Sequence, residues 1–225
     1  MSSTSRNGRW YSGNRDCLPQ YRRAAHLGLR RESDTVHCVS DILTTRLQKL
    51  LATPEPPELG PGPRRGVRPR SELDAELESI FRQTRLAENS RALVRSLILL
   101  WHDHLDASHT ISQGIENPDG SLVHAIMHRR EPDFWNSKYW WRRVGKHACF
   151  AQLGQRVTSL LESRQEHELC SKLVPHGAWD AFAFVDACEA AAGGVATSGR
   201  VQLLRELQRL ETEVALDYFL RDSGS

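Results

Sequence analysis

Residues 89–131 read NSRALVRSLILLWHDHLDASHTISQGIENPDGSLVHAIMHRRE, and this stretch decides the fold. Apolar side chains recur at helical spacing on both sides of the turn-forming run NPDG at residues 117–120. We therefore expect one helix from residue 89 or 90 to residue 115, and a second helix that Ser121 caps. Because the connection is short, the two helices should lie antiparallel as neighbours.

Helical spacing continues through most of the remaining chain from Ser71 onward, and no segment alternates in the manner of a strand. Further helices are expected over residues 71–81, 132–145, 148–163, 178–192 and 198–220. A short helix over residues 40–51 also fits the leucine spacing there. The sequence therefore predicts an all-α fold, a compact bundle of six or seven helices.

Residues 1–70 differ in composition from the rest of the chain. Arginines greatly outnumber acids up to residue 31, and six of the ten prolines fall between Pro54 and Pro69. We expect residues 1–70 to form a disordered basic arm and a Pro/Gly-rich linker, followed by a single all-helical domain over residues 71–225. A targeting segment, a nucleic-acid-touching arm and a misassigned start codon remain open interpretations of the arm.

Composition excludes several classes of protein. The 225 residues are 39% hydrophobic and 26% charged, which suits a globular domain with a real core. No apolar run approaches the roughly 18 residues of a membrane span, and none near Met1 resembles a signal peptide. A net charge of +2 is too mild for a typical nucleic-acid binder. We expect a soluble cytoplasmic protein with neither membrane nor nucleic acid as a partner.

The five cysteines include no CxxC pair and have no nucleophile signature around them, so we assign those of the domain to the core.

Polar side chains form one stripe on each of the two central helices. If the first helix is continuous, His104 lies on the side opposite its polar stripe, among apolar neighbours. We therefore expect His104 to be a hydrogen-bonded core histidine. The first stripe consists of His102, Asp106, His109 and Gln113, and the second of His124, His128 and Glu131. If the stripes face each other, counting residues from the turn places His109 near His128 and Asp106 near Glu131 or Arg130.

Facing stripes would bring imidazoles and carboxylates together in a pocket. We expect His109 or His128 to act as the acid or base, with Asp106 orienting it. The arginines Arg129, Arg130, Arg142 and Arg143 could hold an anion, or could pair with acids of the protein. The other residues expected to bind a ligand are His102, Gln113, His124, Glu131, Asp133, Tyr139 and Asp186. Asn136 is a further hydrogen-bond donor in this region.

The histidine-rich stretch carries a resemblance to a known family. This chain resembles an uncharacterised bacterial protein family that has two sequence signatures. The first is WHDHLD followed by H and Q, and the second is HRREPD followed by N, KYW, RRVG and H. The resemblance extends more loosely through WDAFAFVDACEAA to the C-terminal helix, over residues 75–220. The family has no established reaction, so the resemblance implies no activity.

Three functions remain open on the sequence alone. The leading interpretation is a pocket for a small polar, anionic molecule, with acid/base or hydrolytic chemistry. A metal-dependent hydrolase is the first alternative, in which His102, His109, His124 and His128 bind a divalent transition metal such as zinc, iron or manganese. The second is a non-enzymatic interaction or nucleic-acid-associated protein that uses the arginine-rich residues 1–31 and the aromatic and basic residues 134–143. Both polar stripes would be merely solvated if they faced outward.

Overall fold

The structure is a computed structural model that describes residues 43–194 and 196–221. This part of the chain contains helices and connections but no strand, so the all-α prediction is confirmed. The first helix covers residues 43–50, within the range expected for it. In chain order the others are α2 (Arg70–Phe81), α3 (Glu88–Trp101), α4 (Leu105–Ser112), α5 (Pro118–Arg130), α6 (Phe134–Val144), α7 (Cys149–Ser163), α8 (His167–Leu173), α9 (Ala181–Ala192) and α10 (Ser198–Arg221), with a short 3₁₀ helix at Pro175–Gly177.

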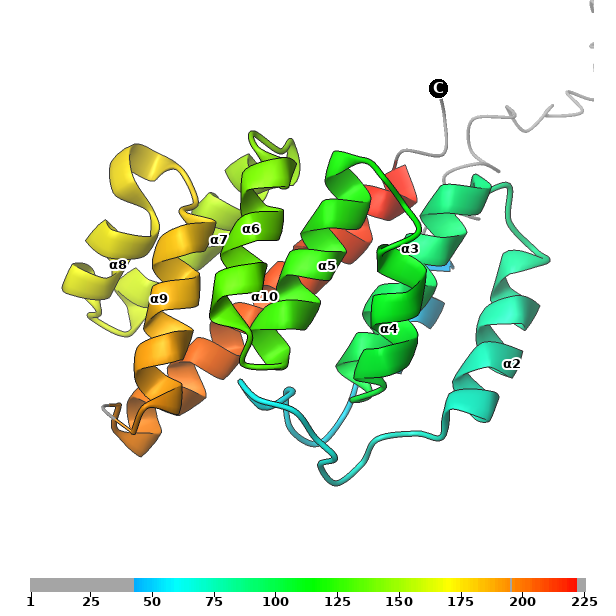
Figure 1. The fold of residues 1–225 in the computed structure, drawn as a ribbon, viewed down its shortest axis with the longest axis horizontal. Coiled ribbons are helices and arrows are strands. Elements are labelled where there is room, and N and C mark those ends of the chain that lie inside the picture. Colours follow the sequence, from blue (N-terminus) through cyan, green and yellow to red (C-terminus); the bar gives the residue numbers. More distant parts are fainter. Residues whose placement is uncertain (1–42, 195, 222–225) are drawn as a thin grey trace, which may run out of the picture.

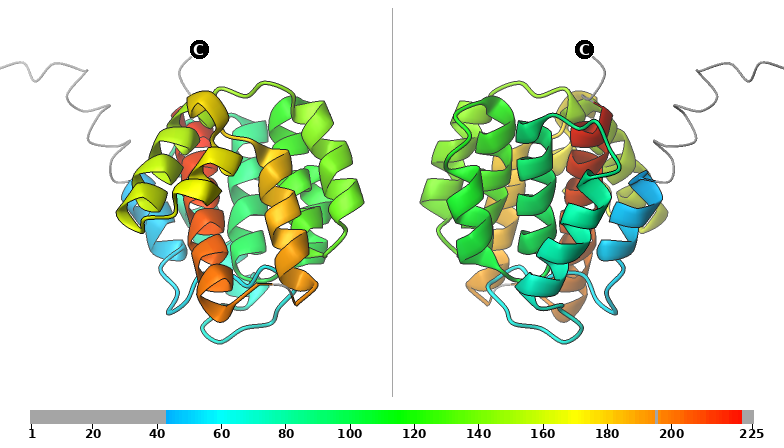
Figure 2. Two further views of the ribbon diagram at one scale, coloured as in Figure 1. Left: turned by 90° about the vertical axis from the view of Figure 1, so that its left-hand side faces the viewer. Right: turned by 90° about the vertical axis from the view of Figure 1, so that its right-hand side faces the viewer.

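Helix α5 is the central element of the bundle, because every residue from Gly120 to Arg130 is buried. It packs between α4 and α6, as Figure 1 shows. The long helix α10 crosses behind α5 and α6 and packs against α3, α7 and α9 (Figures 1 and 2). A helix enclosed in this way must bury its polar side chains as well as its apolar ones.

Capping residues set the start of α5 and of α6. The Asn117 side chain accepts a hydrogen bond of 2.8 Å from the backbone N–H of Gly120, and Pro118 occupies the first turn. Helix α5 therefore begins before Ser121, the residue expected to cap it. Asp133 caps α6 in the same way, accepting from the N–H of Asn136 at 3.1 Å.

The continuous helix predicted over residues 89–115 is wrong. Helix α3 ends at Trp101 and α4 begins at Leu105, and between them Asp103 has a φ of 64°, which no α-helix allows. The hydroxyl oxygens of Ser96 and Ser108 lie 2.9 Å apart, so α4 doubles back against α3. The apolar spacing of this segment is compatible with one helix or with two, because nothing in the periodicity marks the reversal.

A buried carboxylate accounts for the break. The Asp103 side chain, 2% exposed, accepts hydrogen bonds from Arg130 at 2.8 Å and from Arg64 at 2.9 Å. It also accepts from the backbone N–H of Arg64 at 3.0 Å. Burial alone would raise the pKa of Asp103, but these hydrogen bonds and positive charges outweigh it and lower the pKa below its usual value.

Residues 51–69, which we call the strap, were expected to be an extended linker, but in the structure they are tied to the bundle. They contain no helix or strand, and their carbonyl oxygens serve as acceptors for buried side chains. Arg205 of α10 donates to the Pro57 carbonyl at 3.2 Å, and Gln208 donates to the Glu58 carbonyl at 3.0 Å. The predicted domain start at residue 71 therefore leaves out a segment that packs with the domain.

Close approach to Asp103 also explains a glycine of the strap. A Cβ atom at Gly62 would lie 2.4 Å from Oδ2 of Asp103, which is far inside van der Waals contact. Only glycine fits there without moving the carboxylate.

The described residues contain more helices than the six or seven expected. One predicted helix is divided into α3 and α4, and α8 was not predicted at all. Helix α8 has seven residues and buries only Leu169 and Leu173, which is too little for a periodic signal. The basic arm expected at the start of the chain falls within residues 1–42 and lies outside the described residues. Within the described part, every helix is too short or too polar to cross a bilayer.

We expect Asp103→Ala to destabilise the protein by about 3–5 kcal/mol, because it leaves two buried guanidinium groups without their carboxylate. Urea unfolding followed by circular dichroism measures the change. Glu206→Ala is the matched control, since its partner Arg164 is 56% exposed and the pair should contribute less than about 1 kcal/mol. Equal losses in the two variants would contradict the structural role assigned to Asp103.

Candidate functional site

Three histidines from two neighbouring helices form a cluster. His109 projects from α4, and His124 and His128 project from successive turns of α5. One ligand atom from each residue lies within 4.8 Å of those of the other two. The ring centroids are separated by 4.7 Å for His109 and His124, 5.1 Å for His109 and His128, and 4.7 Å for His124 and His128. We call these three residues the histidine cluster.

Two members of the cluster are buried, His109 is half-buried, and one of the buried pair has unpaired nitrogens. His124 is 2% exposed and His128 is 5% exposed. Among the described residues, neither Nδ1 nor Nε2 of His124 has a hydrogen-bond partner. A neutral imidazole has one N–H donor and one lone pair, so burying both without partners costs free energy. The buried ring of His124 is therefore left with one unused donor and one unused lone pair.

Helix α6 forms a wall of the cluster. The ring of Trp140 stacks on His124 with a centroid distance of 4.0 Å and an angle of 17° between the planes. The guanidinium of Arg143 lies 5.1 Å from the centroid of Trp140. This stacking fixes the plane of the His124 ring and leaves its edge, which carries the nitrogens, as the reactive part.

Two polar side chains orient His128. Its Nδ1 lies 3.0 Å from a carboxylate oxygen of Glu131, one turn further along the chain. The amide nitrogen of Asn136 lies 3.1 Å from Nε2 of the same ring. A carboxylate that accepts from one nitrogen of a histidine holds the other nitrogen as an acceptor, which is how metal-binding histidines are commonly oriented.

Burial keeps His124 and His128 uncharged. It lowers the pKa of His124 from 6.5 to about 3, and the neighbouring His128 and His109 add to the effect because imidazolium groups repel one another. The pKa of His128 is lowered as well, since its burial outweighs the opposing influence of Glu131. Both rings are therefore neutral near neutral pH and offer lone pairs.

His102, the fourth histidine expected in a metal site, does not lie in the cluster. The chain reversal at Asp103 separates it from His109, and its two nitrogens contact the end of the first helix and the strap. Nε2 lies 2.8 Å from the Leu50 carbonyl, and Nδ1 accepts from the backbone N–H of Arg68 at 3.1 Å. His104 also contacts the strap, with Nε2 2.9 Å from the Arg68 carbonyl, and is half-buried.

Arg129 and Arg130, expected to bind an anion, are buried in ion pairs within the protein. Arg129 forms a bidentate pair with Glu211 of α10 and lies 4.4 Å from the ring centroid of Phe184. Arg130 pairs with Asp103 and also donates to the Leu100 carbonyl at 3.1 Å. These contacts use both side chains to hold helices together, which is the internal pairing that the sequence left open.

The other residues expected at the site lie around it or on the surface. Gln113 is exposed at the end of α4, and Asp133 is the exposed cap of α6. Tyr139 is 41% exposed and stacks on Trp135 at 6.4 Å. Arg142 and Arg143 are exposed on α6, and Arg142 lies 6.0 Å from Phe182. Asp186 pairs with Lys138 at 2.6 Å, away from the histidines.

A cavity shares one residue, Glu131, with the surroundings of the histidine cluster, although none of the three histidines lines it. It has a volume of about 540 Å³ and lies between the strap, the start of α4 and the end of α5. Asp106 and Glu131 both line it, so the structure places these two carboxylates on one wall, as counting from the turn suggested. Glu131 joins the cavity to the cluster because it lines the first and bonds His128 of the second.

A cysteine–histidine–aspartate chain lies elsewhere in the fold. His147 contacts Sγ of Cys149 at 2.9 Å through Nδ1 and Asp119 at 2.7 Å through Nε2. Burial, together with Glu211 and Asp119, raises the pKa of the Cys149 thiol to about 12, so it stays protonated. These three side chains therefore link the start of α5 to the start of α7, and they offer no thiolate nucleophile.

The chain matches no protein-family model, no curated protein and no solved structure. The resemblance to an uncharacterised bacterial family consequently stays a prediction.

Sequence reasoning missed Trp140 as part of the site and did not commit to Asn136. Trp140 follows a run of aromatic residues on a helix that is apolar nearly all round, so its side chain is indistinguishable from a core residue by spacing. Asn136 lies one turn before it, and this i, i+4 relation is the only signal that places both against the same neighbour.

Acid should destabilise the metal-free protein through His124. A histidine with a lowered folded pKa contributes stability that is complete above its unfolded pKa of 6.5 and is lost as pH falls toward its folded pKa of about 3. We expect the free energy of unfolding, measured with urea and a chelator, to fall between about pH 7.5 and about pH 4.5. In His124→Phe, which keeps the stacking on Trp140, this fall should be smaller. An identical fall in both proteins would contradict a neutral buried His124.

Proposed function

We propose that the protein is a metal-dependent hydrolase that binds one divalent transition metal ion, zinc above all, through His109, His124 and His128. The observation that carries the proposal is the unpaired, buried ring of His124 within a cluster whose ligand atoms lie within 4.8 Å of one another. A metal ion is small enough to lie between these rings, and it would take the lone pair that His124 leaves without a partner.

The donor set fits this kind of ion. Neutral imidazole nitrogen is a preferred ligand of zinc, and three protein ligands with one open position are typical of catalytic zinc sites. Lowered pKa values keep His124 and His128 neutral, which metal binding requires. Glu131 supplies the outer carboxylate that such histidines commonly have.

Hydrolysis is the reaction that the surroundings of the cluster favour. A bound zinc ion lowers the pKa of a coordinated water toward neutrality and polarises a carbonyl or phosphoryl oxygen. Glu131 is placed to exchange protons with a substrate, since it contacts His128 and lines the cavity of about 540 Å³. That cavity is large enough for a small-molecule substrate.

A metal-free pocket for a small anion has less support. The arginines expected to hold the anion, Arg129 and Arg130, are occupied by Glu211 and Asp103. The histidines supply no positive charge for an anion, since the lowered pKa values of His124 and His128 keep both rings neutral. The alternative of an interaction protein rests on the exposed side chains of Trp135 and Tyr139, which are not part of the cluster.

We expect purified protein to contain close to one zinc ion per chain by elemental analysis. After chelation, titration with Co²⁺ should give the visible absorption of a low-symmetry site. Single variants His109→Phe, His124→Phe and His128→Phe should each weaken binding by at least about tenfold, because each loses one nitrogen ligand without leaving a void.

His176→Asn is the matched control for metal binding. His176 is exposed, lies outside the cluster and has a φ of 54°, which asparagine tolerates. Metal affinity should be unchanged in this variant, and circular dichroism should show the same helicity in all four. If no variant differs from the native protein, or if the native protein binds no ion, the proposed metal site is wrong.

The zinc-loaded protein should hydrolyse at least one member of a chromogenic panel of carboxylic esters, anilides and phosphodiesters. Glu131→Gln at saturating zinc should lower the rate by about a hundredfold, because the amide cannot accept a proton. Elemental analysis of the same samples shows whether a lower rate comes from the missing carboxylate or from a lower zinc content. Full zinc occupancy without hydrolysis of any substrate would overturn the reaction and leave the metal site standing.

A further inference from the structure

One hydrogen bond within the protein uses an atom that the proposed metal site needs. Asn136 of α6 faces His128 of α5, and its amide nitrogen lies 3.1 Å from Nε2 and 3.5 Å from Nδ1 of that ring. His128 is 5% exposed and Asn136 is half-buried. The contact therefore lies where water replaces a lost hydrogen bond only in part.

The donors and acceptors around His128 can be assigned. The carboxylate of Glu131, 3.0 Å from Nδ1, accepts hydrogen bonds, so Nδ1 carries the hydrogen. The neutral imidazole that metal binding requires has a single N–H, so Nε2 carries the lone pair. The amide nitrogen of Asn136 donates to that lone pair. If the amide were turned over, its oxygen would face the lone pair and two acceptors would repel each other.

The two histidines of α5 are therefore unequal as ligands. His124 has no hydrogen-bond partner among the described residues, so an ion can take its lone pair without breaking a contact. His128 can bind an ion through Nε2 only if Asn136 withdraws, and through Nδ1 only if Glu131 does.

Helix α6 holds Asn136 in this position. The backbone N–H of Asn136 donates to the capping side chain of Asp133 at 3.1 Å, which fixes the first turn of the helix. One turn later Trp140 stacks on His124 at 4.0 Å. The same helix therefore stacks on one histidine of the cluster and donates to another.

We propose that Asn136 regulates the metal site as an internal competitor, because its amide occupies the Nε2 lone pair of His128 until an ion displaces it. This inference rests on the proposed metal-dependent function. A donor that must be displaced lowers the affinity for the ion, and in the metal-free protein it keeps His128 in the tautomer that presents Nε2.

The zinc affinity of Asn136→Ala, measured by competition with a chromogenic chelator, tests the proposal. We expect the variant to bind zinc about two- to tenfold more tightly than the native protein, which corresponds to the loss of one neutral hydrogen bond from the metal-free state. If Asn136 were a ligand or only supported His128, the same change would weaken binding. Unchanged or weaker binding would overturn the competitor role and leave the metal site standing.

A measurement on the metal-free protein gives a second readout. Long-range ¹H–¹⁵N spectra recorded with a chelator present should show His128 with its hydrogen on Nδ1. In Asn136→Ala the Nε2 resonance should move to higher frequency, toward that of a free lone pair. A hydrogen on Nε2 of the native protein would overturn the proposal whether or not the protein binds an ion.

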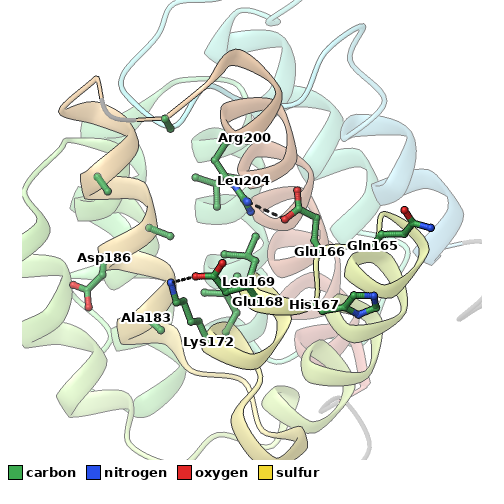
Figure 3. Close-up of a pocket in the computed structure, with 14 residues that line it drawn as sticks. Gln165, Glu166, His167, Glu168, Leu169, Lys172, Ala183, Asp186, Arg200 and Leu204 are labelled. Atoms are coloured by element: carbon green, nitrogen blue, oxygen red, sulfur yellow. Dashed lines mark hydrogen bonds and ion pairs between the residues drawn. The ribbon is translucent and has the colours of Figure 1, made fainter.

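Two control variants separate competition from general loosening of the fold. Gln113→Ala removes an exposed amide at the end of α4. Arg200→Gln removes a hydrogen bond of 2.8 Å to Glu166, in a cavity bounded by α8, α9 and α10 that shares no residue with the histidine cluster (Figure 3). Both variants should bind zinc with native affinity. Tighter binding in either would overturn the proposal, and a native protein that binds no zinc would overturn the proposed function with it.

Discussion

The carboxylate of Asp103 is the constraint on which the rest of the structure depends. It is buried between two arginines that come from segments on either side of it in the sequence, Arg64 of the strap and Arg130 of α5. To reach both, the chain must leave the helix at residue 103, where φ is positive. The reversal that follows sends α4 back along α3 and presents His109 to α5. His102, on the near side of the reversal, faces the strap instead. One buried ion-pair network therefore decides which histidines meet.

The polar side chains of α5 differ in how they are satisfied. Arg129 and Arg130 are almost completely buried, and each has a carboxylate partner on another element. His128 has Glu131 and Asn136. His124 alone among these four has neither ring nitrogen paired, although it is equally buried. Nε of Arg129 is also without a partner, but that guanidinium still binds Glu211, whereas the ring of His124 has no hydrogen bond at all among the described residues, and this difference is what the proposed metal site would account for.

Helical periodicity in the sequence was sufficient for the all-α class and for most helix positions, because apolar spacing on helices such as α2 and α7 directly reflects which face is buried. The i, i+4 spacing of His124 and His128 and the short turn before α5 were likewise enough to predict that His109 lies near them. The reversal at Asp103 was not predictable, since it depends on Arg64 and Arg130 meeting a carboxylate from distant positions. The strap was misjudged for a related reason: proline-rich segments lack regular structure, and only the fold shows that Arg205 and Gln208 bind their carbonyls.

Helix α4 has eight residues, fewer than an isolated helix needs to persist in water. Its place in the bundle consequently depends on its packing against α3 and α5, and local opening of this segment would remove His109 while α5 stayed intact. An ion bridging His109 to two rings of α5 would act as a cross-link across that junction. Exchange of the α4 amide protons with deuterated solvent would then be slower in the metal-bound protein. The exchange rate of α4, which carries only one of the three ligands, would report how much of the metal site is occupied.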